Sequence, residues 1–334
     1  MSKEVLDVVT AKGAFGSVAQ KLLSGGMKVN HLRTNATLRK DEWIQYDTAV
    51  IKAAQQRLVG IADLMRLGLT YNIGNGLAKT VLEYEAESDI TDAEMSMDGI
   101  TKSSKDRPVY DIKSLPLPIL HKDFSLSARV LASSRVTGQS LDVSGAELSA
   151  RKVSDKAEDI LFNGSSSYTF GGGTIYGYTD VPTRNIIDMV KHWDDSSCTG
   201  ENILEDVREM KQALISDRHY GPYILYVPTG YETKLDMDFK ANSDKTIRQR
   251  ILEISGIMEV KVSDKLAAHN VVLVQMTSDV VRLVEGMPIT TVEWKTEGEL
   301  MFNFKVMAIW VPQIRCDYNS RSGIAHLYDT GGPS

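Results

Sequence analysis

Two adjacent carboxylates, Glu158 and Asp159, are candidates for acid–base chemistry in the stretch RKVSDKAEDILFNG, residues 151–164. Two carboxylates that act as general acid and base must converge on one substrate. The apolar residues around them recur at steps of three and four, which predicts a helix over residues 142–163. Adjacent helical residues point about 100° apart, so these two carboxylates do not converge. We therefore expect both of them on the solvated side of a structural helix.

The other side of this helix is an apolar stripe. Asp142 or Ser144 is expected to cap the start of the helix, and Gly164 to end it in a left-handed conformation. Six residues fall within an arc of about 100° and are the expected core of the helix: Ala146, Ala150, Val153, Ala157, Ile160 and Leu161.

Other residue patterns that carry chemistry are missing from the sequence. The histidines never fall three or four residues apart, and no Cys-x-x-Cys or His-Glu-x-x-His occurs, so we expect no zinc site. Residues 171–173 are three glycines without the lysine and spacing of a phosphate loop. His121 and Asp123 are expected to share one face of a strand, as an ordinary exposed pair or as two metal ligands. We expect no cofactor and no enzymatic activity, although a catalytic triad assembled from distant residues stays open.

The composition is that of a folded protein. The chain has 334 residues, of which 42% are hydrophobic and 25% charged, enough for one large domain or two to three small ones. Its net charge of −6 argues against a dedicated nucleic-acid binder. Cys198 and Cys316 lie far apart, as unpaired thiols of a reducing compartment do. No secretory signal or membrane-length apolar run is visible, so synthesis in the cytoplasm is expected.

The hydrophobic patterns change along the chain. Residues 1–37 have a broken apolar pattern and are expected to form an extended arm. A helical pattern follows to about residue 67, and residues 68–120 then read as a long two-stranded ribbon with a polar tip. Residues 195–284 alternate between helical and strand patterns. Because the arm and the ribbon have no core of their own, we expect other copies of the chain to hold them.

Three stretches together resemble encapsulins and the major capsid proteins of tailed phages, which share the Hong Kong 97-like fold. The first is residues 114–164, from SLPLPIL to the helix and its Phe-x-Gly end, and it is the most specific. The second is YGPYILYVPTGYE, residues 220–232. The third is residues 299–327, which begin with the late strand ELMFNFKVMAIWVPQI. The resemblance covers roughly residues 40–330.

The resemblance implies an α+β Hong Kong 97-like capsid fold with an N-terminal arm, an E-loop, a peripheral (P) domain with a long spine helix, and an axial (A) domain. The implied segments are the N-terminal arm (1–37), a helical segment of the P domain (38–67), the E-loop β-ribbon (68–118), the P domain with spine helix 142–163 (119–194), the A domain (195–284) and the C-terminal P-domain strands (285–334).

The function implied is that of a major capsid protein that self-assembles into the icosahedral head of a double-stranded DNA tailed phage. Hexamers and pentamers of the chain would form the shell of the virion, with separate scaffolding, portal and cement proteins as partners. The shell would enclose DNA without sequence-specific binding, and no membrane is involved. The alternatives are an encapsulin-like bacterial nanocompartment enclosing cargo enzymes and an α/β enzyme with an unrecognised pocket. About 35 additional N-terminal residues and a longer ribbon favour the phage capsid over the encapsulin.

The ribbon tip carries the expected contacts between subunits. Some relatives join an E-loop lysine covalently to an asparagine of a neighbouring subunit, and Lys102 and Lys105 are placed for this reaction. The alternative is that both are solvated. With them we expect Asp106 and Arg107 to contact an adjacent copy.

Overall fold

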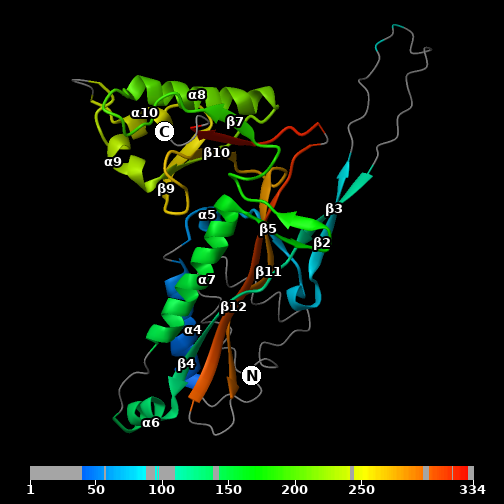
Figure 1. Ribbon diagram of the computed structural model, residues 1–334, viewed down its shortest axis with the longest axis vertical. Helices are drawn as coiled ribbons and strands as arrows, with labels where there is room; N and C mark the ends of the chain where they lie inside the picture. Colours follow the sequence, from blue (N-terminus) through cyan, green and yellow to red (C-terminus); the bar gives the residue numbers. More distant parts are fainter. Residues whose placement is uncertain are drawn as a thin grey trace.

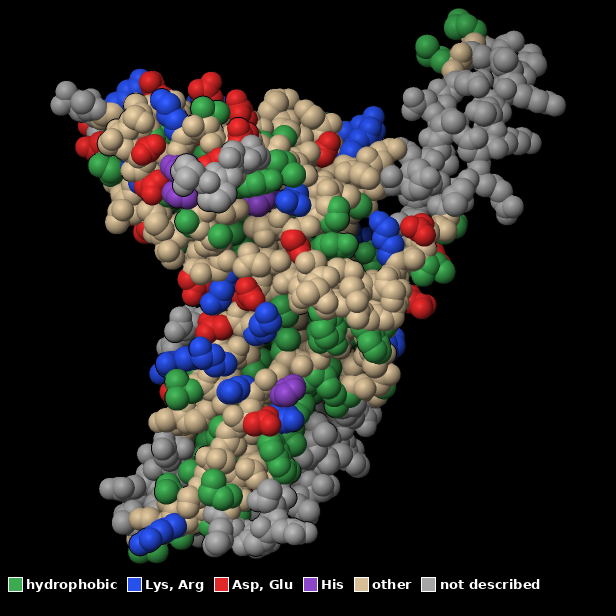
Figure 2. Space-filling model, viewed as in Figure 1, with side chains coloured by type: hydrophobic (Ala, Val, Ile, Leu, Met, Phe, Trp, Pro, Cys, Tyr) green, Lys and Arg blue, Asp and Glu red, His purple; other side chains and the backbone are tan. Residues whose placement is uncertain are grey.

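The molecule consists of two bodies that are stacked along its long axis, with a ribbon projecting beside them (Figure 1). The computed structural model describes residues 40–55, 58–87, 95, 97, 110–137, 143–240, 244–295, 301–317 and 319–329. Each body is built on one β-sheet, and the upper body overhangs the lower one on one side (Figure 2). The expected arm, residues 1–37, lies outside the described residues.

The lower body is built on a four-stranded sheet of order β1-β11-β12-β4. Its centre is a long antiparallel pair, β11 (Val281–Lys295) and β12 (Met301–Ile314). These strands are more than twice the usual length of about five to six residues. β4 (Leu120–Ser127) pairs antiparallel with β12, and the short β1 (Thr70–Asn72) pairs parallel with β11.

Helices α4 (Lys40–Gln55) and α7 (Ser144–Asn163) contact each other and pack on this sheet (Figure 1). Their contact with the sheet is rich in aromatic rings. Phe304 of β12 stacks on Phe124 of β4 with ring centroids 5.0 Å apart, and on Tyr46 of α4 at 5.6 Å. Such pairs contribute about 0.5–1.5 kcal/mol beyond their burial. This cluster fixes α4 against the lower half of the sheet.

Helix α7 corresponds to the helix predicted over residues 142–163, and it starts two residues later than predicted. The six residues of the expected apolar stripe are all buried. Gly164 ends the helix with φ 69°, as its lack of a Cβ allows. Val143 occupies the cap position and its side chain makes no capping hydrogen bond, and Ser144 is already inside the helix. The cap expected from Ser144 is therefore wrong, and Asp142 lies outside the described residues.

The upper body is built on a five-stranded sheet of order β7-β13-β10-β8-β9. Its two central strands are buried on both faces, because one face packs on the lower core and the other on the core of the upper body. The strands are β7 (Asn185–Asp188), β13 (Ile324–Tyr328), β10 (Val271–Gln275), β8 (Tyr223–Pro228) and β9 (Ile257–Ser263).

The outer face of this sheet is covered mainly by α8 (Gly200–Ser216), whose apolar stripe is buried in the upper core (Figure 1). A capping box holds its start: Thr199 and Asn202 exchange side-chain and backbone hydrogen bonds. A second box starts α10 (Ile247–Leu252). The short η2 (Thr229–Tyr231) and α9 (Glu232–Leu235) follow β8.

Two strands of the upper sheet come from segments that the family resemblance assigned to the P domain. β7 lies in a segment assigned to the P domain, and it pairs parallel with β13 in the upper sheet. β13 lies in the segment predicted as C-terminal P-domain strands, residues 285–334, and it pairs with β10. Alternation along one strand does not encode its partner, so the sequence pattern could not place either strand in a sheet.

The ribbon consists of β2 (Val81–Glu87) and β3 (Tyr110–Pro116), paired antiparallel along their whole length. It was expected to begin at residue 68. Residues 70–72 instead form β1 of the lower sheet, and η1 (Gly76–Ala78) leads from there into the ribbon. Of the tip, residues 88–109, only positions 95 and 97 are described, so the predicted contacts at Lys102, Lys105, Asp106 and Arg107 lie outside the described residues.

Residues 165–178 contain a hairpin. β5 (Ser165–Phe170) pairs with β6 (Gly173–Ile175), and the turn uses two glycines with φ of 58° and 78°. Left-handed conformations of this kind favour glycine, which explains Gly171 and Gly172. At Gly173 a Cβ would lie 2.1 Å from the carbonyl oxygen of Ser114. One further helix, α6 (Ala128–Thr137), follows β4. None of the helices formed by the described residues is both long and apolar enough to cross a membrane.

Candidate functional site

Glu158, expected on the solvated side of α7, is completely buried, so that expectation is wrong. Its carboxylate accepts hydrogen bonds from three successive backbone N–H groups, those of Val59 at 3.1 Å, Gly60 at 2.5 Å and Ile61 at 3.2 Å. These N–H groups belong to the start of α5 (Gly60–Arg66). The first N–H groups of a helix have no partner within the helix, and Glu158 supplies one. The helical period of the sequence predicts the apolar stripe of α7. It could not reveal that a second helix, α5, packs against the side of α7 that carries Glu158.

The approach of α5 to α7 depends on Gly60. A Cβ at this position would lie 2.7 Å from Cδ2 of Leu161 on α7, well inside van der Waals contact. Burial raises the pKa of Glu158 to about 7, although the three backbone N–H groups act in the opposite direction. The carboxylate is therefore an internal structural group that ionises close to neutral pH.

The far side of α5 is joined to the upper sheet. Asp63 is buried and accepts a hydrogen bond from the Tyr226 hydroxyl of β8 at 3.0 Å. Lys261 of β9 makes an ion pair with the same carboxylate, and Arg66 lies 3.0 Å from it. Glu158 and Asp63 thus tie one short helix to α7 on one side and to the upper sheet on the other. We call this set of groups the joint.

The two carboxylates of the original motif do not act together. Asp159 is partly exposed and contacts Lys156 at 2.9 Å and Asn163 at 3.0 Å, whereas Glu158 faces α5 from inside the core. Their separation fits two structural roles. An acid–base pair would require both carboxylates to face one accessible site.

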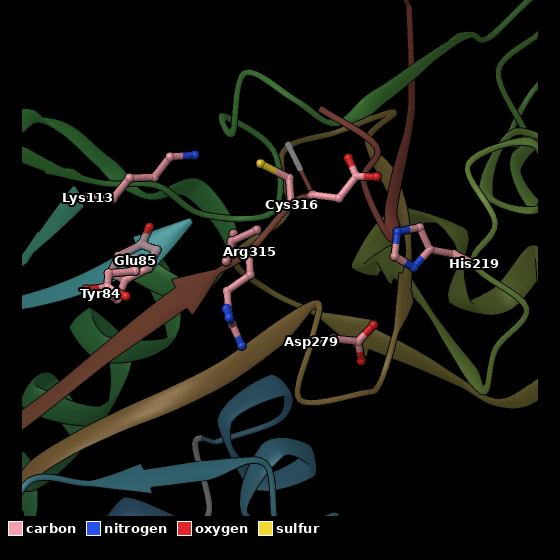
Figure 3. A pocket seen from close by; sticks show the side chains of 9 residues that line it. Tyr84, Glu85, Lys113, His219, Asp279, Arg315 and Cys316 are labelled. Carbon is pink, nitrogen blue, oxygen red and sulfur yellow. The ribbon is translucent and has the colours of Figure 1, made fainter. Parts of the chain in front are cut away.

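A second candidate site is a cavity of about 330 Å³ between the base of the ribbon and the upper body (Figure 3). Three of its walls come from different elements: the ribbon strands, the loop before β11 and the segment after β12. His219, which follows α8, closes the side opposite the ribbon (Figure 3). The lining residues are Tyr84, Glu85, Lys113, His219, Asp279, Ile314, Arg315, Cys316 and Asp317.

The charged groups of this cavity are of both signs and do not form a catalytic set. Arg282, beside the cavity, lies over the Tyr71 ring at 4.3 Å and donates to Gln313 at 2.5 Å. Burial and the nearby Arg315 hold its pKa below the usual value. Burial also raises the pKa of Tyr84, so its hydroxyl stays protonated and is no nucleophile. Mixed charges around an open cavity suit contact between protein segments.

The side chains of the ribbon are buried at its base and exposed farther out. At its base Leu82 and Leu115 are buried against the lower body. Farther out, Tyr110 and Ile112 are 55% and 65% exposed. Met95, near the tip, is fully exposed. Apolar side chains held away from their own core are typical of a surface that another protein covers.

Two histidine-containing arrangements occur among the described residues. His121 and Asp123 share a face of β4, with 3.8 Å between their charged atoms, and both are half-exposed. His192, Asp194 and His269 bring one potential metal-ligand atom each within 4.8 Å of one another. Sequence spacing does not reveal this second group, because its histidines come from turns that are far apart in the chain.

Comparison with known proteins identifies the fold. A family model described as a family of unknown function (DUF6260) matches residues 32–327. The type 1 encapsulin shell protein EncA of Myxococcus xanthus (strain DK1622) is 24% identical over 236 residues, which are 70% of this chain and 71% of EncA.

Solved structures agree with this likeness. The virus-like particle from Pyrococcus furiosus superposes with a TM-score of 0.62 at 17% identity, covering 84% of this chain and 97% of its own. The capsid of Myoviridae phage XM1 also gives a TM-score of 0.62, at 10% identity, covering 78% and 89%. The predicted α+β, Hong Kong 97-like fold is confirmed. The chain belongs to the DUF6260 family, and this family member has the fold of phage capsid and encapsulin shell proteins.

Proposed function

We propose that this protein is the major capsid protein of a tailed phage with double-stranded DNA, and that copies of it assemble into the icosahedral head. The observation that carries the proposal is the fold, which matches shell-forming proteins over nearly their whole length. In this proposal hexamers and pentamers close the shell through head-to-tail contacts, in which two different patches meet. The chain has a structural role in the virion and no enzymatic one.

The ribbon supports this proposal. Its outer half exposes Tyr110, Ile112 and Met95, and a two-stranded ribbon without a covering layer is marginal in water. A neighbouring subunit that covers the ribbon would remove this apolar surface from solvent. Interfaces of permanent complexes commonly bury more than about 2,000 Å², and a projecting ribbon adds such area without a larger core. The proposed tip contacts are Lys102, Lys105, Asp106 and Arg107.

A second candidate function is an encapsulin-like compartment that encloses cargo enzymes. The likeness to EncA over 70% of this chain favours it, as does the nearly full coverage of the Pyrococcus furiosus particle. The two functions share the shell and differ in what it contains. We favour the phage head because residues 1–39 precede the first described helix and because a long connection, residues 88–109, joins the two strands of the ribbon.

The contents of the particle distinguish the two functions. Expression of the chain together with its neighbouring genes, which would supply the proposed scaffolding, portal and cement proteins, should give hollow particles. Nuclease-treated particles from an infected host should retain double-stranded DNA of many sequences. Particles that instead hold one co-purifying enzyme and no DNA would support the compartment. A chain that never forms particles with any neighbouring gene product would contradict both.

A further inference from the structure

The strands of the upper sheet bring two histidines and two aspartates to one edge. His192 and Asp194 follow the end of β7, and Asp329 follows the end of β13. His269 precedes the start of β10. β13 runs parallel to β7 and antiparallel to β10, so these two ends and this start meet at the same edge. Figure 2 shows histidine side chains gathered on the upper body.

The two imidazole rings lie against each other. The ring centroids of His192 and His269 are 3.9 Å apart and the ring planes are inclined by 14°. Nε2 of His192 lies 3.1 Å from Oδ2 of Asp329. Nδ1 of His269 lies 3.7 Å from Oδ1 of Asp194. The rings are about one-third exposed, so solvent and ions reach them.

The backbone that carries these side chains is held firmly. Trp193, between His192 and Asp194, is fully buried, and its Nε1 donates to Asp206 of α8 at 2.7 Å. The backbone N–H of Asp195 donates to the carbonyl oxygen of His192 at 3.1 Å, which closes the turn. A ligand set held in this way loses little conformational entropy on binding an ion.

His269 has both an unusual backbone conformation and a fixed ring. Its φ is 59°, in the left-handed region that residues with a Cβ rarely adopt. The hydroxyl oxygen of the buried Tyr231 lies 2.8 Å from Nδ1 of His269, and its O–H donates to Sδ of Met189 at 3.4 Å. The oxygen is then free to accept the Nδ1–H of the ring. This leaves the lone pair of Nε2 for a ligand.

His192 shows the same arrangement of partners. Its Nε2–H points to a carboxylate oxygen of Asp329, which leaves Nδ1 with its lone pair. An imidazole that donates one N–H to a carboxylate or another acceptor, and offers its second nitrogen, is the usual form of a metal-ligating histidine. Two imidazoles and a carboxylate suit first-row transition ions, whereas Mg²⁺ and Ca²⁺ take oxygen ligands.

We propose that His192, His269 and Asp194 form a binding site for a divalent transition-metal ion of the Zn²⁺ class at this edge of the upper sheet, with Asp329 and Tyr231 positioning the two imidazoles. One potential ligand atom of each of these three residues lies within 4.8 Å of the other two. Tetrahedral zinc with bonds of about 2.0 Å needs ligand atoms about 3.3 Å apart. The two imidazoles are about one-third exposed and Asp194 about half exposed, so binding of the ion would turn the stacked rings about their soft terminal torsions. The ion links the turn after β7 to the β9–β10 turn and so fastens the edge of the sheet.

The test uses the full chain without a polyhistidine tag, after treatment with a chelator. Zn²⁺ should bind with one ion per chain by calorimetry and raise the melting temperature, because an ion that binds only the folded state stabilises it. Co²⁺ at the same site should give the absorption bands of tetrahedral coordination. His192→Ala should weaken Zn²⁺ binding at least tenfold. His269→Asn, chosen because asparagine tolerates the left-handed backbone, should do the same.

Two further variants separate metal binding from folding. Tyr231→Phe keeps the buried ring and removes the hydroxyl that orients His269, so it should weaken Zn²⁺ binding about 10- to 100-fold while the metal-free chain melts normally. His121→Ala removes an exposed histidine that is also paired with an aspartate, and it should bind Zn²⁺ as the unmodified chain does. Absence of stoichiometric binding, or equal losses in His121→Ala and His192→Ala, would overturn the proposal.

Discussion

The contact between Glu158 and the start of α5 gives the sharpest quantitative prediction. Replacing Glu158 with alanine leaves three backbone N–H groups, those of residues 59–61, without their acceptor. An unsatisfied buried donor costs about 1–3 kcal/mol, so the gross loss is about 3–9 kcal/mol. Burial raises the pKa of the carboxyl from 4.5 to about 7, which corresponds to about 3 kcal/mol spent on keeping a buried charge at alkaline pH. The variant escapes that cost, so we expect a net loss of up to about 6 kcal/mol at pH 8.

The assay is urea denaturation followed by tryptophan fluorescence, with hydrogen exchange read by mass spectrometry. In Glu158→Ala the amides of residues 59–61 should exchange faster, while those of α8 change little. Asp159→Asn is the matched control, because Asp159 is partly exposed and its pairs are of the surface kind, which contribute about 0–1 kcal/mol. Equal losses in the two variants, or unchanged protection of residues 59–61, would refute the role assigned to Glu158.

The remaining predictions concern pH, close backbone contact and the core. Burial also raises the pKa of Glu285 to about 7, with Trp310 as its hydrogen-bond donor. The stability this group gives is complete below about pH 4.5 and lost as the pH rises through 7, so Glu285→Gln should raise the unfolding free energy by about 1–3 kcal/mol at pH 8 and by little at pH 4, in urea titrations. No gain at pH 8 would contradict this. A Cβ on Gly76 would lie 2.4 Å from the backbone of β11, whereas one on Gly74 meets nothing within 4 Å. Gly76→Ala should therefore lower the melting temperature strongly and Gly74→Ala hardly at all; equal melting temperatures would show that the contact is not tight. Val153→Asp places an unpaired charge in the buried stripe of α7 and should yield insoluble chain, and a soluble, normally folded product would mean that the stripe is misassigned.

The sequence was most informative where one helix packs against one surface. The stripe from Ala146 to Leu161 repeats at the helical period, so it located α7 to within two residues. The family resemblance then implied a role for this helix as the spine of the P domain, because the order of a Leu-Pro run, a long helix and Phe-x-Gly is specific.

The sequence was least informative where a partner comes from a distant segment. Glu158 looks like any solvated helical carboxylate until α5 is set against it. β1 lies in the segment expected to form the ribbon, and β13 lies in the segment expected to form C-terminal P-domain strands. The sheets that they join are decided by pairing with residues that lie far away in sequence. The histidine pair at positions 192 and 269 could not be predicted for the same reason, since metal-ligand spacing is recognised in a sequence only when the ligands share one helix or one loop. The close approach of Gly60 to Leu161 is likewise visible only in the structure.

The central claim is that copies of this chain close into a shell and that the ribbon is needed for it. The most direct measurement is sedimentation velocity with electron microscopy on the full chain and on a variant lacking residues 89–108, each expressed with its neighbouring genes. The full chain should form uniform hollow particles, and the shortened chain should remain a folded subunit with an unchanged circular dichroism spectrum. A full chain that stays monomeric at every concentration, or a shortened chain whose particles are equally stable, would contradict the claim.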